Sequence, residues 1–250
     1  MKIGFSGNLW SYTGLPQGGK VFSNRLLDRF LIFNMKFEEI KRILGLCCFE
    51  DDLSIIGYRT IAGIDEVGRG SLAGPLVAAA VILDRKKILF EGIDDSKKIS
   101  EARREYLYDL IVDNCVCWAV SEVEPSEIDK YNLTRANIIA FEKALWKLRV
   151  SPDIILADHV NVKGTDSGTH GEYPAECLSI IRGDQKSVSI AAASIVAKVT
   201  RDRIMKNMSK LFPEYGFENN KGYGTKKHLL SLRKYGPTNI HRISFRGVLD

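Results

Sequence analysis

The sequence has no run of 18 or more apolar residues, so we expect no segment of it to span a membrane. Its first residues, MKIGFSGNLWSYTG, contain no continuous apolar stretch followed by a cleavage site of small residues, and we therefore expect a cytoplasmic protein. Only five cysteines occur in 250 residues, and their spacing matches neither a disulfide framework nor a zinc site. Internal repeats and low-complexity tracts are also absent. With 45% hydrophobic and 27% charged residues, the composition is that of a globular protein with one substantial core.

Positive charge is concentrated at one end of the chain. The net charge is +5, but residues 198–250 contain 12 Lys and Arg against 4 Asp and Glu, a local charge of +8, which leaves −3 for residues 1–197. Such a basic region favours a polyanionic partner, although a solvated helix face explains the charge alone equally well.

Residues 1–57 differ from the rest of the chain and are predicted to form an N-terminal extension, helical or partly disordered, ahead of a main domain at 58–250. Within this extension, the apolar residues of KFEEIKRILGL recur at helical spacing. GLPQGGKV at 14–21 resembles a phosphate-binding loop, but it ends in Val21 where a hydroxyl residue is needed, and no strand precedes it. We interpret that match as chance.

From residue 58 onward, strand-like runs alternate with helix-like patterns. Strands are predicted at RTIAGID (59–65), PLVAAAVIL (75–83), CVCWAVSEV (115–123), DIILAD (153–158) and CLSIIRGD (177–184). Helices are predicted from Ser100 to about 114, from a capping box of Ser126 and Asp129, at about 134–148, at 187–208, and within KGYGTKKHLLSLRKYG (221–236). This order predicts an α/β fold in which helices flank both faces of a mixed central sheet.

The stretch TIAGIDEVGRGSLAGPLVAAAVIL, residues 60–83, allows two interpretations. Its glycine-rich turn after a strand fits the loose dinucleotide-binding pattern, whereas the adjacent acids Asp65 and Glu66 indicate a metal site. A dinucleotide site needs a full helix before the second strand and an acid about 20 residues on. Here the second strand closes at Asp84, 16 residues after Gly68, which leaves no room for that helix. The two acids would also repel a pyrophosphate, so we reject the dinucleotide interpretation.

Three predicted strands carry acids at their C-terminal ends: Asp65, Glu66, Asp158 and Asp184. Any one of them could be a solvated strand end. Together they are expected to meet at the edge where open α/β sheets bind ligands. Clustered carboxylates repel one another unless cations neutralise them, and hard oxygen ligands suit Mg²⁺ or Mn²⁺. Two such ions can hold a phosphodiester and activate water, so the sequence predicts a metal-dependent phosphoryl-transfer site.

Seven motifs resemble those of ribonuclease HII, the type 2 ribonuclease H of bacteria, and they occur in that family's order. They are AGIDEVGRG (62–70), DDSKKIS (94–100), IILAD (154–158), RGD (182–184), AAASIVAKVTRDR (191–203), YGFENNKGYGT (215–225) and HRISF (241–245). The resemblance implies a ribonuclease H-like fold with a helical C-terminal part. It also implies a metal-dependent endoribonuclease that hydrolyses RNA in RNA–DNA hybrids and cuts 5′ to ribonucleotides embedded in duplex DNA, leaving 3′-hydroxyl and 5′-phosphate ends.

The resemblance also implies roles for individual residues. Asp65, Glu66, Asp158 and Asp184 would be the catalytic carboxylates, which bind two Mg²⁺ or Mn²⁺ ions during catalysis. Substrate binding would fall to Gly68, Arg69, Gly70 and Tyr223. Ser96, Lys97 and Lys98 are also assigned to substrate binding, with the lysines at backbone phosphates, although the sequence alone favours a solvated loop there. The glycine loop would contact the ribose 2′-hydroxyl, the one group that locally separates RNA from DNA. Tyr223 would stack on the sugar at the DNA side of the junction. We expect a monomer.

The chain departs from the family's pattern at two positions and over one loop. Ser71 replaces a proline often found after the glycine loop, and His159 replaces a common glycine. We interpret His159 as structural and leave open the role of the loop at 160–176. Arg69 stands where the sister type, ribonuclease HIII, carries threonine, and this favours type HII.

Two further hypotheses stay open at the level of sequence. A different nuclease on the same fold, such as a junction resolvase or an exonuclease, would also cluster acids, but it would not need the Gly-Arg-Gly loop with its tyrosine. A hybrid-binding module without catalysis would not need all four acids, which are intact here.

Overall fold

The structure is a computed structural model that describes residues 36–84, 92–158 and 173–249, which belong to one compact unit, Met35–Asp250. None of the helices it describes combines the length and the apolar composition that a membrane span needs. His159, most of the 160–176 loop and the segment at 14–21 lie outside the described residues.

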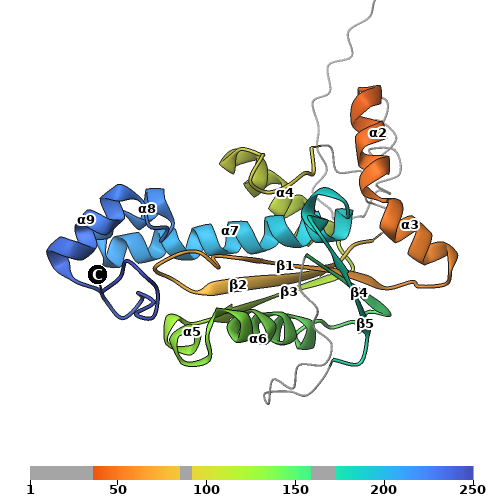
Figure 1. Ribbon diagram of the computed structural model, residues 1–250. Coiled ribbons are helices and arrows are strands. Elements are labelled where there is room, and N and C mark those ends of the chain that lie inside the picture. The colour runs from red at the N-terminus through yellow and green to blue at the C-terminus, as the bar shows by residue number, and fades with distance from the viewer. Residues whose placement is uncertain (1–35, 85–91, 159–172, 250) are drawn as a thin grey trace, which may run out of the picture. The chain divides into compact units, whose positions relative to one another are not determined.

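A five-stranded mixed sheet forms the centre, in the order β3-β2-β1-β4-β5 (Figure 1). β1 pairs antiparallel with β2 and parallel with β4, β2 pairs antiparallel with β3, and β4 pairs parallel with β5. Every residue of β2 is buried, which explains why its sequence is a continuous apolar run. The strands are β1 (Ile61–Val67), β2 (Leu76–Ile82), β3 (Cys117–Val123), β4 (Ile154–Asp158) and β5 (Glu176–Ile180).

Helices cover both faces of the sheet, as the sequence predicts. On one face lies the 24-residue helix α7 (Val188–Leu211), with α4 (Glu101–Asn114) packed on it; α5 (Pro125–Tyr131) and α6 (Leu133–Trp146) cover the other face (Figure 1). The alanines of α7 allow close packing on the sheet. At Gly63 of β1 the backbone of α7 comes so near that a Cβ would collide with Ser189.

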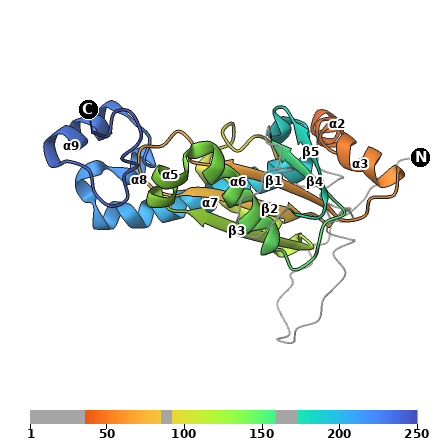
Figure 2. The same cartoon turned by 60° about the horizontal axis from the view of Figure 1, so that its bottom comes forward.

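The C-terminal part packs around the far end of α7 (Figure 2). Its elements are the 3₁₀ turn η2 (Pro213–Tyr215), α8 (Phe217–Asn220) and α9 (Lys226–Tyr235). A separate small core forms here around Tyr215, Phe217 and Leu232. His241 then makes a short β-bridge with Ala73, which joins the end of the chain to the loop after β1.

Two helices precede the sheet, α2 (Phe37–Leu46) and α3 (Cys48–Ile55), and the sequence predicts the first of them. Glu50 of α3 accepts hydrogen bonds from the Ser187 hydroxyl, at 2.5 Å, and from the Ser189 amide, at 2.9 Å, at the start of α7. The domain boundary at residue 57 stays a prediction.

Two local predictions are wrong. The cap of α5 is formed by Glu124 and Glu127, not by Ser126 and Asp129, because Pro125 begins the helix at its first position. The last strand ends at Ile180 rather than at residue 184, because the chain turns through the left-handed Arg182 (φ 57°) into the 3₁₀ turn η1 (Gly183–Gln185).

Candidate active site

The fold brings two of the predicted acids side by side on neighbouring strands. The parallel pairing of β1 with β4 runs to Ile64 opposite Ala157, and the next residues along both strands are Asp65 and Asp158. Neighbouring strands lie about 4.8 Å apart, so these two carboxylates belong to one site at the C-terminal edge of the sheet. Asp65 is buried and Asp158 is half-buried.

Asp65 and Glu66 lie on opposite faces of β1 because side chains alternate along a strand. Asp65 shares its face with Gly63 and approaches Ser194 of α7, whereas Glu66 approaches Asn137 of α6. Burial raises the pKa of the Asp65 carboxyl well above its usual value, and the charge of Glu66 adds to the rise. Burial likewise raises the pKa of Glu66, and the Arg69 guanidinium opposes that shift.

Asp184 reaches the same site from the turn η1 rather than from a strand end. The Gly183 amide next to it donates to Asp158 Oδ1 at 2.9 Å, which ties the turn to β4. Burial raises the pKa of Asp184, and the charges of Asp95 and Asp158 raise it further. Lys97 places its Nζ 3.9 Å from Asp184 Oδ2. Burial lowers the pKa of Lys97, but Asp184 and the neighbouring acids outweigh burial, so that its pKa is raised.

The four acids offer only oxygen ligands, which suits Mg²⁺ or Mn²⁺. Glu66 Oε2 is buried and has no hydrogen-bond partner among the described residues, as expected of an oxygen that a cation would complete. Within the described ranges, no three acidic, imidazole or thiol side chains lie close enough together to hold an ion as they stand. The donor set and the raised pKa values fit a divalent cation, because a cation would relieve the repulsion among these carboxylates.

Gly68 begins the Gly-Arg-Gly loop in a left-handed conformation (φ 94°) that favours glycine. Two side-chain hydrogen bonds hold the backbone of this loop. Ser71 Oγ donates to the Gly68 carbonyl at 2.8 Å, and Arg242 Nη1 donates to the Arg69 carbonyl at 2.9 Å. The Arg69 side chain extends back to Glu66, with 3.4 Å between Nη1 and Oε1. Ser71, which departs from the family's proline, thus closes the turn through its hydroxyl.

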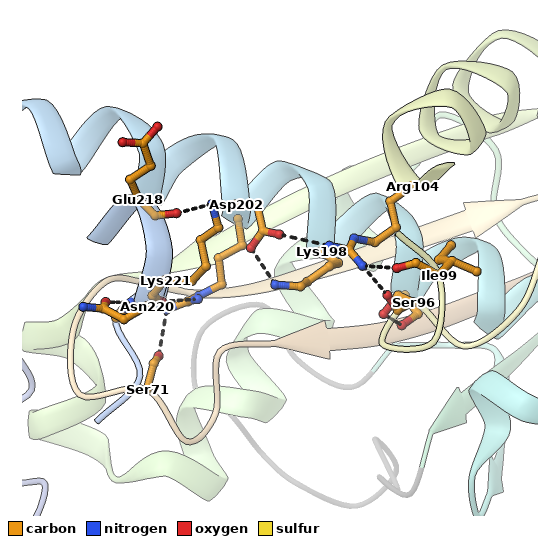
Figure 3. Close-up of polar contacts among 12 residues, drawn as sticks. Ser71, Ser96, Ile99, Arg104, Lys198, Asp202, Glu218, Asn220 and Lys221 are labelled. Atoms are coloured by element: carbon orange, nitrogen blue, oxygen red, sulfur yellow. Dashed lines mark hydrogen bonds and ion pairs between the residues drawn. The ribbon is translucent and has the colours of Figure 1, made fainter. Parts of the chain in front are cut away.

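Arg201, fully buried in α7, joins the Gly-Arg-Gly loop to the loop that carries Tyr223. Its guanidinium donates to Ser71 Oγ at 2.7 Å and to the Lys221 carbonyl at 2.8 Å. Ser71 and Lys221, which accept these two bonds, are labelled in Figure 3. The Arg201 guanidinium also lies over the Tyr223 ring, 5.6 Å from its centroid. The half-exposed Tyr223 ring is therefore held next to the glycine loop, although 155 residues separate Tyr223 from Gly68.

The loop at 94–100 carries the other three residues predicted to bind substrate, Ser96, Lys97 and Lys98. The two lysines are exposed, whereas Ser96 is not. Ser96 is buried, with its hydroxyl 2.9 Å from that of Ser194. Arg104 holds this loop by donating to the Ser96 carbonyl, and it also pairs with Asp202, which binds Lys198 (Figure 3). Lys98 pairs with Asp94 at 3.7 Å. Ser96 is positioned to orient the loop rather than to offer its side chain outward.

Sequence reasoning did not single out four residues that the structure places at the site: Asp95, Asn137, Ser194 and Arg201. Asp95, Ser194 and Arg201 lie inside the motifs that resemble the family. Asn137 is a polar residue on the buried face of a predicted helix, and this conflict with helical periodicity was an available signal.

Comparison with known proteins gives a consistent result. The family model for ribonuclease HII matches residues 62–248. The chain is 44% identical to the ribonuclease HII of Acetivibrio thermocellus over 89% of this chain and 84% of that protein. It is 48% identical to that of Listeria monocytogenes serotype 4a over 86% and 76%. Such identities over most of both chains establish common ancestry.

Solved structures show the same fold. The ribonuclease H2 of Pyrococcus horikoshii is 28% identical, with a TM-score of 0.63 over 76% of this chain and 95% of that one. The ribonuclease HII of Archaeoglobus fulgidus, solved in complex with PCNA, is also 28% identical, with a TM-score of 0.64 over 75% and 96%. The predicted ribonuclease H-like fold is confirmed, and the chain belongs to the ribonuclease HII family.

Proposed function

We propose that this protein, a nuclease by its family, is an endoribonuclease that hydrolyses RNA in RNA–DNA hybrids and cuts 5′ to ribonucleotides embedded in duplex DNA, leaving 3′-hydroxyl and 5′-phosphate ends. The observation that carries the proposal is the joining of three parts: an acidic edge of the sheet, a glycine loop that begins one residue beyond β1, and a tyrosine loop fixed to it by Arg201. A nuclease that ignored sugar identity would not need the last two parts.

Asp65, Glu66, Asp158 and Asp184 would hold two Mg²⁺ or Mn²⁺ ions. When bound, such ions supply an activated water and stabilise the charge on the departing oxygen. The protein's own contribution is to keep the carboxylates facing one edge, through the register of β1 with β4 and the amide of Gly183 on Asp158. The buried Glu66 Oε2, which no donor among the described residues completes, would be free to bind a cation.

Recognition of the ribonucleotide would fall to the two loops. Gly68 and Gly70 carry no Cβ, so their backbone groups can approach a ribose and bond its 2′-hydroxyl. Tyr223 offers a half-exposed ring whose position is fixed by Arg201, and a flat ring can stack on the neighbouring sugar. Arg69 and Lys97 add positive charge beside the acids, and their role would be to neutralise phosphates.

Basic residues of the C-terminal part would hold the duplex beyond the cut. A cavity of about 370 Å³ lies between the end of α7 and α9, lined by Lys206, Lys210 and Lys227 together with Ser209 and Asn219. Glu218 is the one acid in that lining. An excess of cationic side chains around a polar hollow suits the phosphate backbone of a nucleic acid.

The decisive experiment uses a DNA duplex with one ribonucleotide, incubated with Mg²⁺, with Mn²⁺ or with EDTA, beside an all-DNA duplex of the same sequence. The expected result is a single cut 5′ to the ribonucleotide, present with either ion and absent with EDTA, and no cut in the all-DNA duplex. Cleavage of the all-DNA duplex would instead indicate a resolvase or exonuclease. Tight binding without any cut would indicate a binding module.

Tyr223→Ala tests the junction assignment within the same assay. We expect it to cut at more positions along a run of ribonucleotides, because the ring no longer excludes misplaced sugars, whereas Tyr223→Phe keeps the ring and the selection. An unchanged pattern and rate in Tyr223→Ala would remove Tyr223 from the recognition site. Light scattering of the same samples measures the monomeric state that we propose.

A further inference from the structure

Two buried histidines form a chain of hydrogen bonds that ends on the backbone of Tyr223. The Nε2 atoms of His228, in α9, and His241, in the C-terminal segment, lie 3.1 Å apart. His228 Nδ1 is 3.0 Å from the Tyr223 carbonyl oxygen, and the Thr238 amide donates to His241 Nδ1 at 2.9 Å. Three stretches of the C-terminal part, the loop of Tyr223, the helix α9 and the segment at 238–241, are connected in this way.

The donors and acceptors of this chain can be assigned in one way only. The Thr238 amide can only donate, so His241 Nδ1 accepts and must carry no proton. A neutral His241 then carries its proton on Nε2 and donates it to His228 Nε2. His228 therefore carries its own proton on Nδ1 and donates it to the Tyr223 carbonyl. A second proton on either ring would place two N–H groups against each other, so both imidazoles are neutral.

The surroundings of the pair agree with this assignment. Both imidazoles are almost completely buried and lie against the rings of Tyr215 and Phe217, within 6.2 Å between centroids. Burial lowers the pKa of His241 to about 4, and burial also lowers the pKa of His228. Neither ring is exposed to a substrate, so these residues act through another group.

We propose that His241 and His228 are positioning residues that fix the Tyr223 carbonyl, and through it the Tyr223 ring, so that they determine how strictly the enzyme selects the nucleotide at which it cuts. The proposal rests on the proposed function, because the two histidines would hold the loop that carries Tyr223, the residue proposed to recognise the substrate. The Tyr223 carbonyl accepts from His228 and from the Thr225 amide at 2.8 Å, while Arg201 restrains the ring. Loss of the His228 bond would remove one of these restraints on Tyr223.

Nuclear magnetic resonance of the full chain tests the relay without reference to activity. The sequence has four histidines, so ¹⁵N spectra of the imidazoles give few signals to assign. At neutral pH we expect His241 to be protonated on Nε2 alone and His228 on Nδ1 alone, both without tautomer exchange. Any other tautomer at either residue, or exchange between tautomers, would overturn the relay.

Two substitutions of His228 separate its two hydrogen bonds. Asn places an amide where Nδ1 stands and can still donate to Tyr223, whereas Gln places its amide where Nε2 stands and keeps only the link to His241. On a duplex with a run of ribonucleotides, we expect His228→Gln to lower the preference for the junction about tenfold, the worth of one hydrogen bond. His228→Asn should stay within about threefold of the wild type.

A purely structural role predicts a different result, in which both variants lose stability and rate together and keep the cutting pattern. Equal junction preference in His228→Gln and the wild type, or equal loss in both variants, overturns the proposal. A wild-type chain that cuts without selecting any position contradicts the proposed function itself, and the tautomer measurement still decides whether the relay exists.

Discussion

The guanidinium of Arg201 occupies the space that a side chain on Gly68 would need. A Cβ built on Gly68 would stand well inside the contact distance of Arg201 Nε, and the guanidinium cannot withdraw without giving up its bonds to Ser71, Ala73 and Lys221. The absence of a side chain at Gly68 is thus required twice, by the left-handed backbone and by the residue that supports the loop.

Gly68→Ala should therefore damage both stability and cleavage. We expect an unfolding free energy lower by roughly 1–3 kcal/mol, from backbone strain and the displaced guanidinium, and cleavage at a ribonucleotide reduced by about tenfold or more. Denaturant unfolding and single-turnover cleavage measure the two effects. Gly70→Ala is the control, because a Cβ there meets nothing within 4 Å, and its stability should be unchanged. Equal stability of Gly68→Ala and the wild type would contradict this account.

Asp65→Asn should abolish cleavage, leave duplex binding largely intact and stabilise the metal-free protein. Burial raises the folded-state pKa of Asp65 above its reference value of 3.8, so its ionisation in the fold costs stability as the pH rises above that value. Removing the charge should therefore raise the unfolding free energy at pH 7 without divalent ions. Calorimetry in EDTA measures this gain. The exposed acid Asp109, changed to Asn, is the matched control. Retained turnover in Asp65→Asn would refute the metal-site assignment.

The lysines that line the C-terminal cavity should govern the salt dependence of binding. Changing Lys206, Lys210 and Lys227 together to Gln should weaken duplex binding about tenfold at low salt. The slope of log K against log salt should become shallower by about 0.9 for each phosphate that the protein no longer neutralises. Fluorescence anisotropy over a salt series gives this slope. A variant with Lys36 and Lys41 changed to Gln removes exposed charge elsewhere and should keep the wild-type slope. Identical slopes for both variants would show that the cavity does not bind the duplex.

The buried imidazole pair should make the fold sensitive to acid. His241 titrates near 4 in the fold and near 6.5 when unfolded, so its contribution to stability is complete above pH 6.5 and is lost as the pH falls toward 4. Over that window the stability advantage of the wild type over His241→Asn should shrink by up to about 3 kcal/mol. Because the buried acids shift stability in the opposite direction, the difference between the two proteins is the quantity to measure. A constant difference from pH 7 to pH 4 would contradict a neutral His241.

Asp65, Glu66 and Asp158 could be placed from the sequence because apolar strands with acids at their ends obey simple rules of alternation and edge geometry. The sequence predicts Asp184 at the end of a strand, whereas the structure places it in the turn η1 near Asp158, because the apolar run CLSIIRGD gives no sign that Arg182 turns the chain. A hydrophobic pattern does not show which residue adopts a left-handed backbone conformation. Residue type gives a hint only where the residue is one that favours that conformation, such as glycine or asparagine.

Arg201 shows a second limit on what can be predicted from the sequence. In the sequence, Arg201 is one of several cations in a basic helix, and nothing local separates it from its exposed neighbour Arg203. Its role depends on carbonyls supplied by residues 73, 75 and 221, which only the tertiary fold gathers. The same holds for Ser96, whose burial against Ser194 is set by helix packing rather than by its own motif.

The residues that hold the glycine loop are synthesised after the acids of the site. All four acids precede residue 185, but the loop after Gly68 is held by Arg201, by the carbonyls of Gly222 and Ile240, and by Arg242. During synthesis, the four acids therefore leave the ribosome long before the groups that hold the glycine loop. A growing chain thus contains all four acids before it contains the groups that hold the glycine loop, and the last of these groups, Ile240 and Arg242, lie near its C-terminal end.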